Sequence, residues 1–405
     1  MSQKIKFNVI IPTRERADTL FHCLRTVVAQ DYEDFNIIVS DNFSQDNTRE
    51  VVASFADPRI KYINTGKRIS MSHNWEFALG HVSDGWVTIV GDDDGLLPGA
   101  LIKVADVIQK TGCQAITSKW CNYDWPDSPI LPDRLVVPLT SGIGIRNSRE
   151  WLSKLMRGEA VYPDLPFMYT GGFVNVLAIN RARGTNGIFY FSMSPDIYSA
   201  IALASVLDNY VVLKEPISIA GISSHSNGTS CLGIGKNLMP AKKFFSEGNI
   251  PFHSMLAGGE VVKSIPILVY ESYLQSKHLH NDFLNVELKD QLTLALADVA
   301  SKNYIDLRKY CNQIAHVNGI DMDAVDREIK KKRKELFLQG LKLKPNQKFK
   351  QLTISGQKFG VKDVYGASFL ANAAFILETR YVHWKLDNFF RLMKKVAKFI
   401  IKKIY

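Results

Sequence analysis

The first 110 residues alternate between short apolar runs and longer amphipathic stretches, and this alternation limits the possible folds more than any other feature. Strands are expected at residues 7–12, 35–40, 59–63 and 86–90, of which 59–63 is short and 86–90 is a buried apolar run. Helices are expected at residues 17–29, 46–55, 72–82 and 98–110. This order predicts an α/β fold, in which a mostly parallel sheet is flanked by helices and binds ligands at the carboxyl ends of its strands.

Three polar loops follow strands of this predicted sheet. They comprise residues 13–16, 41–44 and 92–94. Because the carboxyl ends of parallel strands meet at one edge, we expect these loops to lie close together. Their convergence favours a nucleotide site more than any single loop does.

The aspartates Asp92, Asp93 and Asp94 directly follow the fourth predicted strand. Carboxylates at this spacing repel one another and raise each other's pKa unless a cation neutralises them. Mg²⁺ and Mn²⁺ are bound by oxygen ligands of this kind, commonly shared with a phosphate. The sequence therefore favours a metal and phosphate site. A solvated acidic turn is the alternative, since Asp is also favoured where a helix begins.

The glycine patterns exclude two other nucleotide-binding folds. Gly142-Ile143-Gly144 and Gly233-Ile234-Gly235 lack the third glycine and the strand-turn-helix context of a dinucleotide fingerprint, and no G-x-x-x-x-G-K-[ST] occurs. Rossmann cofactors and P-loop hydrolysis are therefore disfavoured.

The composition is that of a globular protein with excess positive charge. The length of 405 residues suggests two domains or one large domain with an extension. The chain is 46% hydrophobic and 22% charged, which is typical of a globular protein. The net charge of +10 favours polyanionic surroundings such as nucleic acid, anionic lipid or phosphorylated substrates.

Cysteine usage and the apolar runs indicate the compartment. The five cysteines form no C-x-x-C pair, so we expect reduced thiols in a cytosolic protein. The first strand is predicted so early that we expect no signal peptide, and no apolar run approaches the ~20 residues of a membrane-spanning helix.

Three segments together resemble the family 2 glycosyltransferases of the GT-A fold. They run from Val9 to Arg16, from Val39 to Thr48 and from Gly91 to Pro98. The resemblance is good over about the first 100 residues and continues in patches to about Ser230. It implies a nucleotide-sugar-binding sheet flanked by helices and an enzyme that transfers a sugar.

The resemblance also implies roles for residues of the three loops. Base and ribose of a nucleotide sugar would be held by Pro12, Thr13, Glu15 and Asp41. The family's D-x-D motif maps onto Asp92, Asp93 and Asp94, with Asp94 the first choice for the ligand of a divalent metal, Mn²⁺ or Mg²⁺. Two departures are visible: Gly91 stands where the family pattern begins with Asp, and Ser40-Asp41-Asn42 replaces the commoner Asp-Asp-Gly.

The segment from Lys67 to Trp75 resembles the family's basic stretch before the third helix. Arg68 could bind a diphosphate as a bidentate donor, and Asn74 could lie near the donor sugar. The alternative is a surface arginine and an asparagine that only starts a helix.

Three further positions acquire roles through the resemblance. Asp196 lies in the first turn of a helix that begins at Ser194-Pro195, and by sequence alone its role would be to stabilise that helix. The resemblance instead implies a catalytic base, because the family's inverting members place their catalytic carboxylate at a similar position. Gly171 and Gly172 resemble a loop lining the donor sugar, or form a plain turn. His225 resembles a histidine that completes the metal shell, although Ser223 replaces the usual arginine, and it is otherwise a polar loop residue.

After residue 235 the pattern becomes helical, so we expect a GT-A domain at 1–235 and a mainly α-helical region at 236–405. Helices are expected at residues 262–275, 281–300, 304–316 and 323–341. In Phe389–Tyr405 one helical face is apolar and the other lysine-rich, which suits an anionic membrane surface. Packing or homo-oligomer contacts of the C-terminal helices are the alternative, and nucleic acid is disfavoured because no binding motif accompanies the charge.

The expected function is therefore that of an inverting, metal-dependent glycosyltransferase of the bacterial cell-surface polysaccharide type. It would move a hexosyl or N-acetylhexosaminyl unit from a nucleotide-sugar donor, a UDP-sugar favoured, to a glycan or lipid-linked acceptor. The enzyme would lie in the cytoplasm, at the inner face of the cell membrane. The alternatives are a sugar-nucleotide pyrophosphorylase and a non-catalytic nucleic-acid-binding or scaffold protein.

Overall fold

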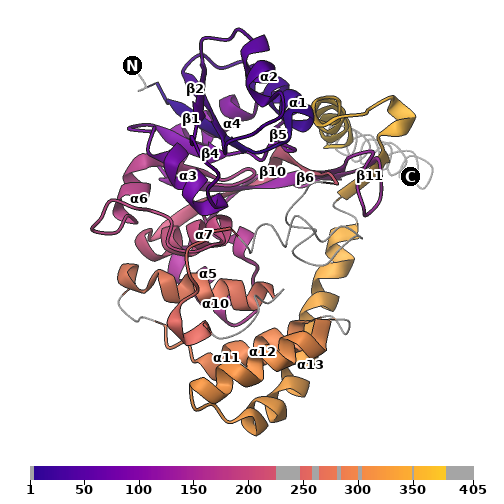
Figure 1. Ribbon diagram of the computed structural model, residues 1–405. Coiled ribbons are helices and arrows are strands. Elements are labelled where there is room, and N and C mark those ends of the chain that lie inside the picture. Colours follow the sequence, from indigo (N-terminus) through magenta and orange to yellow (C-terminus); the bar gives the residue numbers. More distant parts are fainter. Residues whose placement is uncertain are drawn as a thin grey trace, which may run out of the picture.

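The computed structural model describes residues 4–224, 247–257, 264–280, 284–299, 303–348 and 351–379. Their strands form one mixed sheet (Figure 1). The strands are β1 Phe7–Thr13, β2 Phe35–Asp41, β3 Ile60–Asn64, β4 Trp86–Ile89, β5 Gly95–Leu96, β6 Ala115–Asp124, β7 Arg134–Pro138, β8 Ile143–Asn147, β9 Phe173–Asn175, β10 Asn209–Ile222 and β11 Gln351–Ser355.

Helices cover both faces of this sheet and continue into a separate layer. They are α1 Ala17–Val28, α2 Thr48–Ser54, α3 Met71–Leu79, α4 Ala100–Thr111, α5 Ser148–Met156, α6 Val176–Arg181, α7 Pro195–Val206, α10 Ile265–Gln275, α11 Leu288–Asp298, α12 Tyr304–Val317, α13 Met322–Lys348 and a helix at 364–379. Short 3-10 turns are η1 Tyr162–Asp164, η2 Ser254–Leu256, η3 Lys277–Leu279 and η5 Gln357–Phe359.

The sheet order confirms the predicted parallel core. Strands run β11-β7-β6-β9-β4-β1-β2-β3, and β10 pairs with β5, β6 and β8. Parallel pairing joins β1 to β2 and β4, β2 to β3, and β6 to β10, while β9 runs antiparallel between β4 and β6. The carboxyl ends of β1, β2 and β4 therefore meet at one edge, as expected for a ligand site.

The alternation of side chains along β1 explains how helices come to lie on both faces. Phe7, Val9 and Ile11 face a core shared with α1 and α4, while Ile10 faces a second core shared with α3 and α7. A strand buried on both faces favours apolar residues, which is why β1 is mostly apolar, and the amide of its buried Asn8 donates a hydrogen bond to the Asp84 carbonyl over 2.8 Å.

The helical region packs beneath the sheet through α7. Buried residues of α5, α7 and α10–α13 form one apolar cluster. Figure 1 shows α10, α11 and α12 gathered on that side, with α13 running back towards β11. The mainly helical character predicted after residue 235 is thus confirmed, whereas the boundary at 235/236 falls outside the described residues and stays a prediction.

Two elements of the C-terminal region were not predicted, a strand and the helix that follows it. Strand β11 pairs antiparallel with β7, and the helix at 364–379 buries Val364, Ala371 and Phe375 against β6 and β7. Five residues of mixed polarity give no strand signal by themselves, because their partner lies far away in the sequence. Strand β11 is therefore an exception within a C-terminal region that is mainly helical, as expected.

Among the described helices, none combines the length and hydropathy needed to cross a lipid bilayer. The tail Phe389–Tyr405, predicted to bind anionic membranes, lies outside the described residues.

Candidate active site

The three predicted loops meet at the carboxyl edge of the sheet and are joined by hydrogen bonds. The Thr13 hydroxyl donates to Asp92 Oδ2 over 2.8 Å, which links the loop after β1 to the aspartate turn after β4. The Glu15 amide donates to Ser44 Oγ over 2.8 Å, and Glu15 Oε1 accepts from the Gln45 amide over 3.0 Å. Glu15 thus ties the loop after β1 to the loop after β2.

Asp92 forms an ion pair with Arg16, a residue of the first predicted loop to which the sequence assigned no individual role. Arg16 Nη1 lies 2.8 Å from Asp92 Oδ1, and the Asp92 side chain is only 5% exposed. Burial raises the pKa of Asp92, and the Arg16 charge opposes that rise. A basic residue in the loop beside an acidic cluster was the available sequence signal.

Asp94 faces inward and accepts hydrogen bonds at both carboxylate oxygens. Its Oδ1 accepts from the Gly221 amide over 2.7 Å, and its Oδ2 accepts from Thr170 Oγ1 over 2.9 Å and from the Gly91 amide over 3.2 Å. Burial and the neighbouring charge of Asp93 nevertheless raise the pKa of Asp94 to about 7. The donors position this carboxylate without supplying the positive charge that would neutralise it.

Asp93 is held through its side chain and its backbone. Ser223 Oγ donates to Asp93 Oδ2 over 2.8 Å, and Trp125 Nε1 donates to the Asp93 carbonyl over 3.0 Å. A Cβ on Gly221 would lie 1.8 Å from that carbonyl oxygen, so β10 can pass the aspartate turn only with a glycine there. Ser223, which replaces the arginine of the family pattern, therefore contacts the acidic cluster.

Gly171 and Gly172 lie beside the cluster, and the packing of the protein itself demands both. A Cβ on Gly171 would lie 2.5 Å from Ser118 Oγ, and one on Gly172 would lie 1.8 Å from the Phe167 carbonyl oxygen. Gly171 also has φ +90°, in the left-handed region that favours glycine. This tight loop presents Thr170 to Asp94, so the glycines position a neighbour of the cluster, and their contact with a donor sugar stays a prediction.

Asp41 ends β2 and is 1% exposed. Tyr62 Oη donates to its Oδ2 over 2.6 Å, Asn64 Nδ2 donates to the same oxygen over 2.9 Å, and the Ser44 amide donates to Oδ1 over 3.0 Å. Burial, together with the hydrogen bond to Asp41, raises the pKa of Tyr62 to about 12. Asp41 is therefore a carboxylate fixed at the edge, next to Thr13 in the register of β1 and β2.

The structure places Pro12 and Asn74 within the packing of β2. Pro12 is half-buried opposite Ser40 in the register. Asn74 Oδ1 accepts from Ser40 Oγ over 2.7 Å, and its Nδ2 donates to the Ser40 carbonyl over 3.3 Å. These bonds tether α3 to β2, and Ser70, not Asn74, is the N-cap residue of that helix.

Arg68 shares a carboxylate with an arginine of the first loop. Glu247 Oε1 lies 2.7 Å from Arg14 Nη1 and 3.2 Å from Arg68 Nε. Two guanidinium groups from different loops thus converge on one anionic oxygen, which is the arrangement expected where a diphosphate binds.

Asp196 lies in the first turn of α7, as predicted, and is held by a tyrosine that sequence reasoning missed. The Tyr162 hydroxyl donates to Asp196 Oδ2 over 2.8 Å. Burial raises the pKa of Asp196, while the hydrogen bond from Tyr162 opposes the rise. Tyr162 lies in η1, more than thirty positions earlier, so no local pattern links the two residues.

A divalent metal fits the chemistry of this cluster. The side chains of Asp93 and Asp94 supply hard oxygen donors. Burial and the Asp93 charge together raise the pKa of Asp94, and a bound cation would oppose both effects. Within the described residues, however, no three His, Cys, Asp or Glu side chains are arranged as a ready metal shell. His225, the other predicted ligand, lies outside the described residues.

Comparisons with known proteins agree with this geometry. Residues 8–173 match the family described as Glycosyl transferase family 2. The GalNAc(5)-diNAcBac-PP-undecaprenol beta-1,3-glucosyltransferase of Campylobacter jejuni is 39% identical over 99 residues, 24% of this chain and 32% of that protein. The UDP-Glc:alpha-D-GlcNAc-diphosphoundecaprenol beta-1,3-glucosyltransferase WfgD of Escherichia coli is 24% identical over 131 residues, 32% of this chain and 51% of that protein.

Among solved structures, the crystal structure of TarS from S. aureus aligns with a TM-score of 0.46 and 17% identity, covering 81% of this chain and 55% of that one. The chain spans about a third to a half of the two curated relatives. The family match covers the sheet edge where the three loops and the aspartate turn converge, and residues 8–173 are therefore a glycosyl transferase family 2 domain.

Proposed function

We propose that this protein is an inverting glycosyltransferase that moves a hexosyl or N-acetylhexosaminyl unit from a UDP-sugar to a hydroxyl group of a glycan or lipid-linked acceptor. The observation that carries the proposal is the hydrogen-bonded convergence of Thr13, Glu15 and the aspartate turn at the edge of a family 2 domain. The family match favours sugar transfer over the pyrophosphorylase and scaffold alternatives.

The donor binds along the loops after β1 and β2. Thr13, Glu15 and Asp41 hold the base and ribose, with Pro12 and Asn74 supporting the strand that presents them. Arg68 and Arg14 meet the diphosphate, since both already bind one carboxylate oxygen of Glu247. The name of the E. coli relative, which specifies UDP-Glc, supports a uridine nucleotide.

Asp94 and Asp93 would hold a divalent metal, Mn²⁺ or Mg²⁺, with His225 completing its shell. When bound, this ion supplies the positive charge that stabilises a leaving diphosphate. Arg16 confines Asp92 to an ion pair, so Asp92 shapes the site through Thr13.

Asp196 is the general base. It accepts the proton of the acceptor hydroxyl as the oxygen attacks the anomeric carbon, and the bond from that carbon to the diphosphate breaks, so that UDP leaves with the electron pair. A carboxylate whose pKa is raised by burial is a stronger base than an exposed one, and the Tyr162 hydrogen bond fixes its orientation. Proton transfer of this kind contributes about 10²–10⁴-fold to the rate.

The acceptor is a hydroxyl on a membrane-linked glycan. Both curated relatives carry undecaprenol diphosphate acceptors in their names. The sequence pattern of Phe389–Tyr405 would hold the enzyme at the inner face of the cell membrane, next to such an acceptor.

Nucleotide-sugar hydrolysis tests this proposal. UDP-glucose and UDP-N-acetylglucosamine would be incubated with the full chain and Mn²⁺ or Mg²⁺, and release of UDP would be followed with and without a polyprenyl-diphosphate sugar acceptor. We expect slow metal-dependent UDP release that the acceptor accelerates. Absence of both UDP release and donor binding in the folded protein contradicts the proposal.

A further inference from the structure

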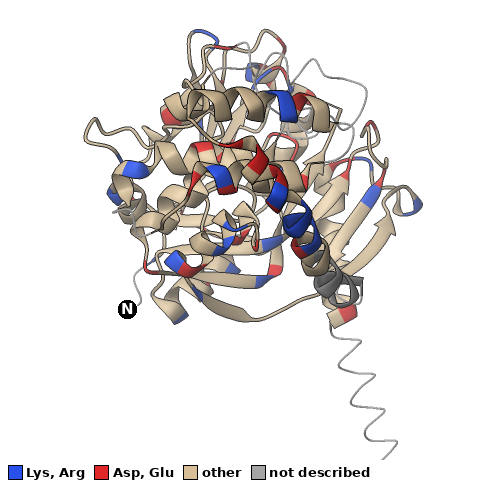
Figure 2. Cartoon of the chain, turned by 90° about the horizontal axis from the view of Figure 1, so that it is seen from below, with Lys and Arg blue, Asp and Glu red and all other residues tan. Residues whose placement is uncertain are grey.

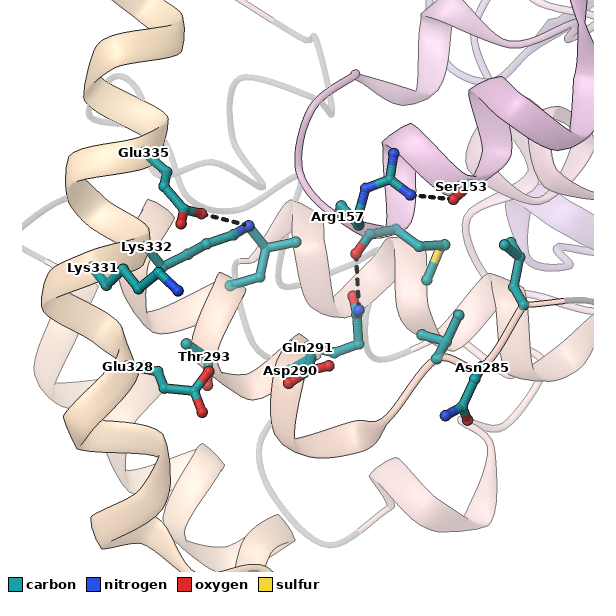
Figure 3. Close-up of a pocket in the computed structure, with 14 residues that line it drawn as sticks. Ser153, Arg157, Asn285, Asp290, Gln291, Thr293, Glu328, Lys331, Lys332 and Glu335 are labelled. Carbon is teal, nitrogen blue, oxygen red and sulfur yellow. Dashed lines mark hydrogen bonds and ion pairs between the residues drawn. The ribbon is translucent and has the colours of Figure 1, made fainter.

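A cavity lies in the helical region, and neither the aspartate turn nor Asp196 lines it. Its volume is about 340 Å³, and it is bounded by the end of α5, the segment before α11, α11 itself and α13 (Figure 3). None of its lining residues belongs to the candidate active site. The cavity is therefore not explained by the proposed transfer reaction.

The floor of this cavity carries a buried acceptor that lacks a hydrogen-bond donor. Gln291 is 3% exposed, and its Nε2 donates to the Met156 carbonyl over 2.9 Å. Because a carbonyl oxygen can only accept, this bond fixes which end of the amide is the nitrogen. Gln291 Oε1 has no hydrogen-bond partner among the described residues. A buried amide oxygen in this state favours a ligand that brings an O–H or N–H group.

Apolar groups complete the floor. Met156 is 4% exposed and Leu294 is 6% exposed, and both line the cavity beside Gln291. A ligand that fits this floor therefore needs a hydrogen-bond donor for Gln291 Oε1 and, next to it, an apolar face that can pack against Met156 and Leu294.

The rim carries equal numbers of acidic and basic side chains. These are Arg157, Lys331 and Lys332 against Asp290, Glu328 and Glu335. Several are already paired: Lys332 lies 3.3 Å from Glu335, and Glu328 lies 2.9 Å from Lys289 outside the lining. Figure 2 shows the same mixture of Lys and Arg with Asp and Glu on the face seen from below. An anion would meet three carboxylates and a cation three basic groups, so neither is favoured.

We infer that this cavity binds a neutral sugar ring, as a saccharide site separate from the transfer site. Each sugar hydroxyl both donates and accepts, so it can satisfy Gln291 Oε1 and pair with the rim carboxylates and ammonium groups. The apolar floor accommodates the carbon–hydrogen face of the ring. The volume is at the lower end of the ~300–1,000 Å³ range of small-molecule pockets, which suits one ring better than a long oligosaccharide.

Ligand-observed NMR with the full chain tests the inference, using D-glucose and N-acetyl-D-glucosamine as probes. We expect saturation transfer to at least one sugar, and Gln291→Met to weaken its binding about tenfold, the change expected from one lost buried hydrogen bond. Lys331→Gln changes an exposed residue of the rim, so it tests the cavity even if the Gln291 variant fails to fold. It should weaken sugar binding about threefold. Lys330→Gln is the matched control, because Lys330 is exposed on the same helix but does not line the cavity.

Three results would overturn the inference. They are absence of sugar binding in the folded wild-type chain, equal binding by the wild-type protein and both cavity variants, and displacement of the sugar by inorganic phosphate. The outcome is independent of the proposed transfer reaction, because Asp196→Asn should leave sugar binding at this cavity unchanged. Lys331→Gln should in turn leave UDP release unchanged.

Discussion

The Tyr162 hydroxyl donates a hydrogen bond to Asp196 Oδ2 over 2.8 Å, which joins η1 to the first turn of α7. Burial and the adjacent Asp196 charge raise the pKa of Tyr162 well above its ordinary value, so the phenol keeps its proton. Tyr162 is therefore always the donor, and Asp196 is held as an acceptor. If Asp196 is the base that we propose, this hydrogen bond already orients its carboxylate for accepting a proton.

Replacing Asp196 by Asn should abolish transfer and leave donor binding intact, because an amide cannot accept the acceptor proton. We expect the turnover number to fall by about 10²–10⁴-fold. Tyr162→Phe should lower it by about tenfold, since the base remains but loses its orientation. UDP-sugar affinity by calorimetry and transfer rates would be measured on all three proteins. Wild-type turnover by Asp196→Asn would rule out the base.

Replacing Asp94 by Asn should weaken metal binding by about tenfold or more, because a charged oxygen ligand is lost at almost constant size. The measurement is the shift in thermal midpoint on adding Mn²⁺ together with UDP. Thr170→Val is the matched control, since it removes one hydrogen bond to the same carboxylate without changing its charge. If both variants lose the shift equally, hydrogen bonding rather than metal ligation explains the effect of Asp94.

Gly172→Ala should destabilise the fold by about 3 kcal/mol or more, because the new methyl group would overlap the Phe167 carbonyl oxygen. Gly144→Ala is the control: its nearest neighbour, Lys214 Cε, is 3.9 Å away, so we expect a change within about 0.5 kcal/mol. Chemical denaturation measures both. A Gly172→Ala protein of wild-type stability that fails to bind UDP-sugar would instead assign this glycine to the donor.

Glu271 should make stability fall as the pH rises. It is fully buried, its Oε1 accepts from Gln275 over 2.9 Å, and its Oε2 accepts from Ser192. Burial raises its pKa from 4.5 to about 7. Between these values the native protein binds more protons than the unfolded chain, so the free energy of unfolding decreases, by up to about 3 kcal/mol for this group.

Glu271→Gln should remove this pH-dependent part of the free energy of unfolding. Chemical denaturation of the wild-type and variant proteins at about pH 5 and about pH 8 would measure the difference. The exposed Glu287→Gln serves as the control and should keep the wild-type pH dependence. An unchanged slope in Glu271→Gln would mean that Glu271 is ionised in the native protein throughout.

Deleting Phe389–Tyr405 should weaken sedimentation with anionic vesicles and leave UDP release intact, because the proposed chemistry lies before residue 236. Salt should weaken the binding of the intact chain, since the lysines of this segment act through screened charge. Unchanged vesicle binding, together with a new oligomeric state, would show that the apolar face is a packing surface.

Much of the N-terminal fold could be predicted because its signals are local. Each strand of the parallel core, from β1 to β4, lies at a short local segment that the sequence marks as a strand, and α1, α3 and α4 begin within two residues of their expected positions. The meeting of Thr13 with Asp92 then follows from topology alone. Local pattern and global fold agree over this stretch.

The parts of the site that were missed depend on distant pairings. Tyr162 reaches Asp196, Gly221 reaches Asp94, and Ser223 reaches Asp93 only after the chain has folded. Gly171 was itself named from the sequence, but the Ser118 and Ser218 hydroxyl groups that exclude a larger side chain there could not be predicted. Sequence patterns report periodicity and chemistry, and they do not report which side chains become neighbours across a sheet.

The pairing of β11 with β7 has a consequence for synthesis of the chain. Until residue 355 has left the ribosome, β7 has an unpaired edge, and apolar residues of β6 and β7 such as Tyr123 and Leu135 lack the cover of the helix at 364–379. That helix is also anchored on α1, where the Arg25 guanidinium lies 3.8 Å from the Tyr365 ring centroid. The edge of the sheet at β7 is therefore completed only when the C-terminal part of the chain has been synthesised. A nascent chain halted between residues 138 and 351 would expose an unpaired strand edge and uncovered apolar side chains, which chaperones bind.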